Sequence, residues 1–232
     1  KHGEFGNPDN FCDDYEATNW MSATVATSDE KIISKIKDIC KRDPRDGKVT
    51  TGGIVTVKDS TENWYLSWTI NRQPQFKAQD KNMVLVWLYA LNTNKEGNFV
   101  KKAMRDCTGK EVCEEWLYHI GVDPKEIPDL AENACNTTTC FMPFINAFFQ
   151  PRKNEDRPKV VPEGSVNFAF LGQFTETPRD TIFTIEYSMR TGMESVYTLL
   201  DIDRGVPEVW GSKYDVRELL RACYYAIDKK PI

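Results

Sequence analysis

Long apolar runs are missing from this sequence. No stretch approaches the roughly 20 consecutive apolar residues that a membrane-spanning helix needs, and we expect no secretory leader. The first residue is Lys1 rather than Met, which indicates a processed, trimmed or engineered N-terminus. An excess of basic charge is also missing, because 35 acidic residues outnumber 30 basic ones and the net charge is −5. A nucleic-acid binder normally carries a basic face, so we expect no nucleic-acid partner.

Histidine is scarce and the cysteines are irregularly spaced. The only histidines are His2 and His119, and the seven cysteines are Cys12, Cys40, Cys107, Cys113, Cys135, Cys140 and Cys223. An odd number in a chain of this length predicts free thiols in a cytoplasmic protein rather than a disulfide framework. The spacings fit zinc poorly, so we expect no metal site. His119 is expected near the end of a helix, in a structural role that suits the helix dipole.

The apolar share of 40% and the charged share of 28% are typical of a soluble globular protein. Residues 1–27 are polar and look irregular. Helices are predicted at 29–41, capped by Thr27 or Ser28, at 109–120, and from Pro124 to about 134. For the second helix, Thr108 and Glu111 predict a capping box and Gly121 a left-handed end.

Three strands are predicted at 49–57, 63–71 and 83–91, and polar turns between them indicate a meander. In the middle strand, Trp64, Leu66, Trp68 and Ile70 point one way, whereas Tyr65, Ser67, Thr69 and Asn71 point the other. The third strand, "MVLVWLYAL", is apolar on both faces and is expected to be covered on both. The polar face of the middle strand therefore either lines an internal cavity or belongs to an ordinary half-exposed strand. The segment "NTTTCFMPFINAFFQP" is either core or the wall of an apolar pocket.

The last third of the chain predicts a strand, a turn and two helices. A buried strand is expected at 165–171, a turn at Gly172 and a polar loop at 173–180. Thr191 and Glu194 suggest a capping box that opens a helix to about 203. A final helix at about 213–229 has one apolar side, and it either packs on the fold or contacts a membrane surface. Its apolar residues are Val216, Leu219, Leu220, Cys223 and Ile227, and its basic residues are Arg217, Arg221, Lys229 and Lys230.

Long stretches in order along nearly the whole chain resemble the oleate hydratases, first known as myosin-cross-reactive antigens. They are "KDICKRDP", "TGGIVTVKDS", "SWTINRQPQF", "EEWLYHIG", "VPEGSVNFAFLGQF" and "RDTIFTIEYSMRTGMESVYTLLDIDRGVPEVWGS". The resemblance implies an FAD-dependent enzyme that adds water across a cis double bond of an unsaturated fatty acid. Full-length members are much longer and carry their dinucleotide-binding loop and catalytic groups in an N-terminal part. This chain has no G-x-G-x-x-G, so it is expected to be the C-terminal portion, with no catalytic residue of its own.

The fold that these observations predict is mixed α/β. An antiparallel or mixed sheet with helices would form a substrate-binding portion at 1–160. A strand–turn–helix at 161–205 would return to a Rossmann-like FAD domain whose N-terminal part is absent, and 206–232 would form a C-terminal helical segment.

The resemblance also implies two sets of site residues. In the family, the segment that matches "SWTINRQPQF" helps to bind the fatty-acid carboxylate, and the matching positions are Thr69, Asn71 and Gln75. Some relatives have His at the last position, and Gln supplies a donor without positive charge. The flavin is expected near Gln173 and Phe174 and near a helix start at Arg190, Thr191, Gly192 and Met193, where free N–H groups would face the ring.

Two other readings remain open. The chain is alternatively a non-catalytic module that binds lipid or docks on a membrane through its last helix, or part of a fatty-acid double-bond isomerase. As part of a full-length enzyme it is expected to be cytoplasmic, with membrane contact through that helix, and to form a homodimer. Incubating the intact protein with oleate and reduced FAD, and identifying the products, separates these readings.

Overall fold

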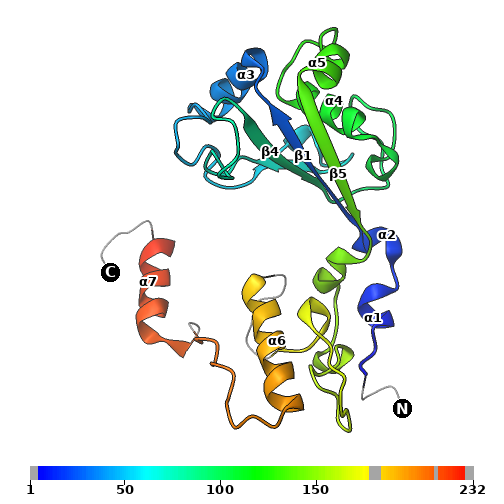
Figure 1. Ribbon diagram of the computed structural model, residues 1–232, viewed down its shortest axis with the longest axis vertical. Helices are drawn as coiled ribbons and strands as arrows, with labels where there is room; N and C mark the ends of the chain where they lie inside the picture. The colour runs from blue at the N-terminus through cyan, green and yellow to red at the C-terminus, as the bar shows by residue number, and fades with distance from the viewer. Residues whose placement is uncertain (1–4, 178–183, 212–213, 228–232) are drawn as a thin grey trace. The chain divides into compact units, whose positions relative to one another are not determined.

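The computed structural model describes residues 5–177, 184–211 and 214–227, and within them the chain forms two compact units (Figure 1). One unit holds Asp14–Ala147, and the other combines Lys1–Asp13 with Phe148–Ile232. The predicted boundaries at residues 160 and 205 concern the whole protein and stay predictions. Each unit is described below by itself.

The first unit is built on a five-stranded sheet in the order β2-β3-β4-β1-β5. Its strands are β1 (Trp20–Thr27), β2 (Val55–Thr56), β3 (Leu66–Thr69), β4 (Val84–Ala90) and β5 (Cys135–Met142). Every neighbouring pair is antiparallel. The predicted mixed α/β class and the meander of β2, β3 and β4 are confirmed, although β2 keeps only two residues of the expected 49–57.

The sequence prediction missed β1 and β5. β1 lies inside the segment expected to be irregular, yet it pairs along its full length with both β4 and β5. Its inward residues Met21, Ala23 and Val25 are buried, and they alternate with residues that are only partly covered or exposed. In β5, too, half-buried and exposed residues alternate along most of the strand. Alanine, serine and threonine give this period little hydrophobic contrast, so a composition-based prediction does not detect it.

Three helices pack on the face of the sheet that carries the inward-pointing residues. They are α3 (Glu30–Cys40), α4 (Gly109–His119) and α5 (Ile127–Asn133). One continuous core joins the strands to these helices and includes Trp68, Leu88, Ile36, Trp116 and Ile127. The short helix α2 (Tyr15–Thr18) precedes β1. These helices and the core side chains beneath them therefore cover one face of the sheet.

The helix signals were mostly correct, with two corrections. Thr108 and Glu111 form the predicted capping box of α4, and Gly121 adopts the left-handed conformation at φ 82°. The cap of α3 is Asp29, whose carboxylate accepts from the N–H groups of Lys31 and Ile32. Helix α5 begins at Ile127, not at Pro124, and it has Pro128 in its first turn.

The other face of the sheet is only partly covered. The register places Thr69, Trp87, Thr24 and Thr138 side by side across four strands. Trp87 is 37% exposed and Leu85 and Tyr89 are half-buried, so the prediction that β4 is covered on both faces is wrong. Its outward residues are large and apolar because they form an aromatic surface rather than a second core.

The second unit contains α1 (Asp9–Cys12), α6 (Ile185–Leu199), α7 (Val216–Ala226) and several short 3₁₀ turns. Arg157 is buried in this unit. The guanidinium donates to the Tyr187 hydroxyl at 2.9 Å and to the Gln173 carbonyl at 3.2 Å, and it pairs with Glu176 at 3.3 Å. Tyr187 in turn donates to the Thr175 carbonyl at 2.5 Å. These bonds tie the start of α6 to the turn that precedes it.

The predicted buried strand at 165–171 is not formed. No strand includes these residues, and Val166 is 84%, Phe168 47% and Leu171 58% exposed. Among the described residues no strand pairs with this segment, and an unpaired extended segment has no ladder to hold it.

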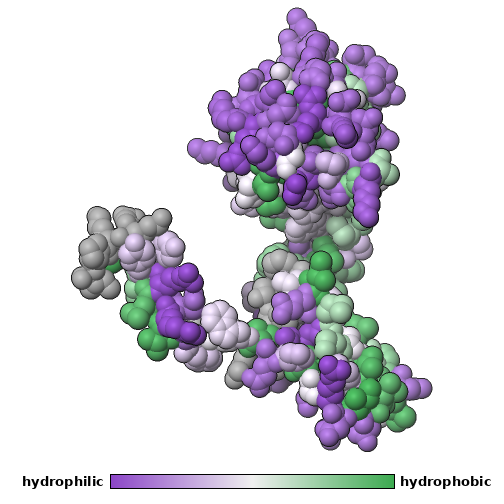
Figure 2. All heavy atoms as spheres, turned by 60° about the vertical axis from the view of Figure 1, so that its left-hand side comes forward, coloured by the Kyte–Doolittle hydropathy of each residue, from purple (hydrophilic) through white to green (hydrophobic). Residues whose placement is uncertain are grey.

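Figure 2 shows purple side chains over most of the visible face of the sheet-bearing unit and more green on the other unit.

A buried carboxylate holds the loop before α4. Glu115 accepts hydrogen bonds from the N–H groups of Asn98, Phe99 and Val100 at 2.6–2.9 Å and contacts His119 Nε2 at 3.0 Å. Burial alone would raise the pKa of Glu115, but the hydrogen bonds from His119 and these N–H groups outweigh it and hold the pKa below its usual range. His119, the last residue of α4, thus has the structural role expected of it.

Glu115→Gln should lower the free energy of unfolding by about 2–4 kcal/mol, because the amide replaces an acceptor oxygen with a donor that faces N–H groups. The matched control is Glu114→Gln, one residue earlier on the same helix. Because the folded pKa is depressed, the stabilisation is present above the unfolded value of about 4.3 and is lost as pH falls through the folded pKa. Urea titrations at pH 7 and pH 3 measure both effects. Equal loss in the two variants, or a difference independent of pH, would contradict this assignment.

Candidate functional site

A pocket of about 380 Å³ opens on the partly covered face of the sheet, where β3 ends. The loop before β2 forms one wall, and the end of β3 with Trp87 of β4 forms the other. The lining residues are Val49, Thr51, Gly52, Gly53, Ile54, Thr69, Ile70, Asn71 and Trp87. The polar face of β3 therefore ends in an open pocket, and not in the internal cavity that one of the two sequence readings expected.

Thr69 lies on the pocket wall, but its hydroxyl is already committed. It donates to the Gly53 carbonyl at 2.9 Å and lies 2.8 Å from the hydroxyl of Thr51. A hydroxyl has one proton, so the Thr51 hydroxyl is the donor in that contact and Thr69 the acceptor. Thr51 also accepts from the Ile70 N–H at 3.3 Å. In this arrangement Thr69 joins the two walls of the pocket and has no proton left for a ligand.

Asn71 and Gln75 are placed differently. Asn71 lines the pocket and is exposed, and its side-chain amide makes no hydrogen bond to the described residues. Gln75 is exposed, is not among the lining residues, and its N–H donates to Gln79 Oε1 at 2.7 Å. The structure thus brings Thr69 and Asn71 together in one pocket and leaves Gln75 outside it.

Sequence reasoning missed Gln73, which holds this loop in place. Its side chain is buried, donates to the Asn71 carbonyl at 2.9 Å, and accepts from Gln79 at 2.6 Å and from the Leu85 N–H at 3.3 Å. A buried amide that bonds main-chain groups on both sides fixes the backbone of Asn71. The signal was present in the run of glutamines after the strand, but nothing in the sequence distinguishes the buried one.

An aromatic row continues from the pocket across the same face. Trp87 is in the pocket wall, its ring centroid lies 5.1 Å from that of Tyr89, and Tyr89 stacks on Trp20 at 4.6 Å. These three side chains come from β1 and β4 and form an apolar surface next to a pocket that contains a few polar groups. Such a pairing suits a ligand with a polar end and an apolar body.

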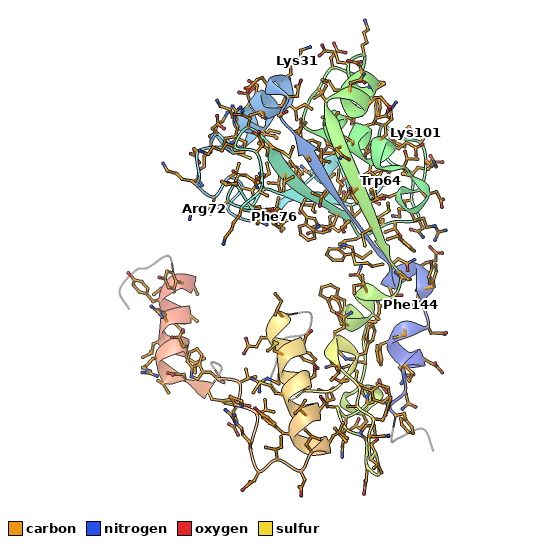
Figure 3. All side chains as sticks on the ribbon, in the orientation of Figure 1. Lys31, Trp64, Arg72, Phe76, Lys101 and Phe144 are labelled. Carbon is orange, nitrogen blue, oxygen red and sulfur yellow. The ribbon has the colours of Figure 1, made fainter. Side chains whose placement is uncertain are left out.

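The pocket wall is electrically neutral, because no lining residue carries a charge. One cation bonds to the wall from outside the lining, because Arg42 donates to the carbonyl of Val49 at 2.9 Å. Arg72 is exposed on the loop after β3 (Figure 3). Figure 3 shows Arg72 and Phe76 on the same side of the unit, whereas Trp64 lies inside it. The residues that line the pocket therefore offer an anion only neutral donors.

The predicted flavin residues of α6 are not at a helix start. The helix begins at Ile185, and the Thr184 side chain caps it by accepting from the Tyr187 N–H. Arg190, Thr191, Gly192 and Met193 therefore lie inside the helix, where main-chain N–H groups bond within the helix. Thr191 belongs to the buried stripe that also includes Tyr187 and Ser195, and this stripe explains the earlier start. The capping box of Thr191 and Glu194 and the free N–H groups expected there are wrong.

Thr191 has another role that ties the helix to the turn. Its hydroxyl accepts from the Gly172 N–H at 3.0 Å and donates to the Ser188 carbonyl at 2.9 Å. Gly172 has φ 79°, as its place at the predicted turn requires, and Gln173 and Phe174 follow in a 3₁₀ turn. The two predicted groups of flavin residues are therefore neighbours, although residues 178–183 between them lie outside the described residues.

The fold and pocket define a mixed α/β protein with a small neutral binding pocket beside an aromatic surface. A family model described as the MCRA family matches residues 1–197, so the chain belongs to that family. It is 51% identical to an oleate hydratase of Streptococcus pyogenes serotype M49 (strain NZ131) over 99% of this chain, and 32% identical to a linoleate hydratase of Lactiplantibacillus plantarum over 83%. These matches cover only 39% and 35% of the relatives.

Thr69→Val should lower the free energy of unfolding by about 1–3 kcal/mol, because two hydrogen bonds between the pocket walls are lost while the side-chain shape is kept. The control is Thr24→Val, on the same face in β1, where the side chain is exposed. That change should stay within about 0.5 kcal/mol. Urea titration of both variants makes the comparison, and equal stability of the two would refute the role given to Thr69.

Proposed function

We propose that this chain is the C-terminal part of a fatty acid hydratase, and that its pocket binds the carboxylate end of an oleate-type unsaturated fatty acid. The observation that carries the proposal is the pocket itself, which joins Thr69 and Asn71 next to the aromatic row of Trp87, Tyr89 and Trp20. The chain is similar to an oleate hydratase and a linoleate hydratase, which supports the reaction class. In the proposed reaction, water is added across the cis double bond to give a hydroxy fatty acid.

The energetics of such a ligand fit this site. A carboxylate taken out of water needs several donors, and a hydrogen bond to a charged group contributes about 1.5–3 kcal/mol. Each methylene laid on the aromatic row would add about 0.8 kcal/mol. Head-group contacts then set how far the chain reaches, and so position the double bond relative to the reacting groups. In this arrangement the Asn71 amide donates to the carboxylate, and Thr69 holds the wall.

FAD is the cofactor that the family resemblance implies, and the residues here fit it in part. Phe174 is exposed at the turn, and a Cβ added at Gly192 would meet nothing within 4 Å, so both leave room for a flat ring. The main-chain N–H groups of α6 do not fit, because they lie within the helix. Flavin contact through Gln173 and Phe174 and the exposed side of α6 is therefore part of the proposal. When bound, FAD would polarise or shape the site, since hydration changes no oxidation state overall.

Asn71→Ala in the full-length protein should weaken oleate binding about 10–100-fold, because a charge-assisted hydrogen bond is lost. Asn82→Ala is the control, since Asn82 is exposed in the loop before β4. Fluorescence titration with oleate measures the dissociation constants, and chromatography of the products shows the position of the hydroxyl group. Unchanged affinity and product position would overturn the head-group assignment, and Gln75→Ala should have the smaller effect.

The 232-residue chain by itself should not hydrate oleate, because it carries no dinucleotide-binding glycine motif and no catalytic group has been assigned in it. Incubating the chain with oleate and reduced FAD, beside the full-length protein, tests this. Hydroxy fatty acid from the isolated chain would refute it. A shifted double bond from the full-length protein would favour the isomerase, and fatty-acid binding without any product would favour the lipid-binding module.

The last helix favours a membrane contact as a second element of the proposal. Within α7 and beside it, Trp210, Tyr214, Val216, Leu219 and Leu220 are all at least half exposed. The basic residues Arg217 and Arg221 pair with Asp215 and Glu218, and Lys229 and Lys230 lie outside the described residues. No helix among the described residues is long and apolar enough to cross a bilayer.

We propose that the protein lies in the cytoplasm, which its free thiols favour. There it would form a homodimer and contact membranes through α7.

A further inference from the structure

The pocket wall opposite Asn71 is a turn of three residues, Thr51, Gly52 and Gly53. Gly52 has φ 70°, a left-handed conformation that residues with a side chain rarely adopt. A Cβ added at either glycine would meet nothing within 4 Å, so the space in front of the turn is open. Both glycines line the pocket. The turn thus exposes main chain, rather than side chains, to whatever the pocket holds.

The main-chain N–H groups of this turn are unused. Neither Gly52 nor Gly53 donates a hydrogen bond to any of the described residues, although both are next to the edge of the sheet. The carbonyl of Gly53 is engaged by Thr69, and the hydroxyl of Thr51 by Thr69 and Ile70. Those hydrogen bonds hold the turn against the end of β3. Among the described residues, the unused donors of the pocket thus include these two N–H groups beside the Asn71 amide and the indole N–H of Trp87.

We propose that the N–H groups of Gly52 and Gly53 form an anion-binding nest for the fatty-acid carboxylate, opposite the amide of Asn71. Successive N–H groups around a left-handed residue converge on one point, and such concavities bind anions without a charged side chain. This arrangement accounts for how a pocket lined by neutral residues could bind a carboxylate. It also gives a reason for the Thr69 hydroxyl to donate its only proton to the Gly53 carbonyl, because that bond positions the turn. The inference rests on the proposed function and adds main-chain donors to it.

Selective labelling with ¹⁵N-glycine tests the nest directly. The chain has thirteen glycines, so its spectrum is simple, and Gly52→Ala and Gly53→Ala assign the two signals. Titration with octanoate should move the amide protons of Gly52 and Gly53 downfield to saturation, whereas Gly47 and Gly205 should stay in place. Octan-1-ol has the same tail and no charge, and it should not produce this shift. Sodium chloride at matched ionic strength provides the baseline.

Two variants separate the N–H group from the space around it. Gly53→Pro removes the donor, and Gly53→Ala keeps it while adding a Cβ that meets nothing. Octanoate affinity should fall about tenfold or more in the proline variant, as the loss of one hydrogen bond to a charged group predicts, and much less in the alanine variant. Circular dichroism checks that the proline variant folds, and the glycine spectrum carries the test if it does not.

The outcomes distinguish the nest from the proposed function. Octanoate binding that depends on Asn71 but leaves the Gly52 and Gly53 signals unmoved would overturn the nest and leave the head-group pocket standing. Equal shifts with octan-1-ol would show that the turn senses the tail, which also overturns it. If octanoate does not bind and the full-length protein does not bind oleate, the proposed function fails and the nest fails with it.

Discussion

The alternation of side chains across the antiparallel sheet is the constraint on which this molecule depends. One face of each strand supplies the core under α3, α4 and α5, and the other supplies Thr69, Trp87 and the aromatic row. A shift of one residue in the pairing of β3 with β4 would exchange the two faces of β3. Trp68 would then face outward, and the pocket would lose Thr69. The pocket is thus a consequence of the same register that buries the core.

Buried polar side chains hold the loops that the sheet does not reach. Glu115 collects three main-chain N–H groups before α4, and Gln73 bonds main chain on both sides of the loop after β3. Both satisfy backbone groups that would otherwise be lost from water, at a cost of about 1–3 kcal/mol each. The position of Asn71 therefore depends on Gln73 as well as on the strand. A site made on a loop becomes precise when its backbone is held in this way.

The same logic separates the two walls of the pocket. Hydroxyl groups of Thr51 and Thr69 are consumed in joining the walls, which leaves main-chain and amide donors for a ligand. In the second unit, Arg157, Tyr187 and Thr191 join α6 to the turn at Gly172–Phe174 in a comparable manner. In both units, a threonine that the sequence suggests as a ligand contact, Thr69 or Thr191, instead fixes the position of neighbouring main chain through hydrogen bonds.

The sequence by itself determined the elements whose signals are local. Capping residues and strong apolar periods located α3 and α4, the alternation in "NWYLSWTIN" assigned the two faces of β3, and the ordered similarity along the chain identified the family. Only the tertiary structure revealed β1 and β5, because strands of alanine, serine and threonine are stabilised by their partners rather than by their own hydrophobicity. The structure also shows that α6 begins at Ile185 and not at Thr191. Thr191 lies in the buried stripe of this helix, and burial of that stripe decides the helix start over the capping pattern. The pocket itself could not be read from the sequence, since its walls are 18 residues apart at the Thr51–Thr69 contact and meet only through pairing and hydrogen bonds.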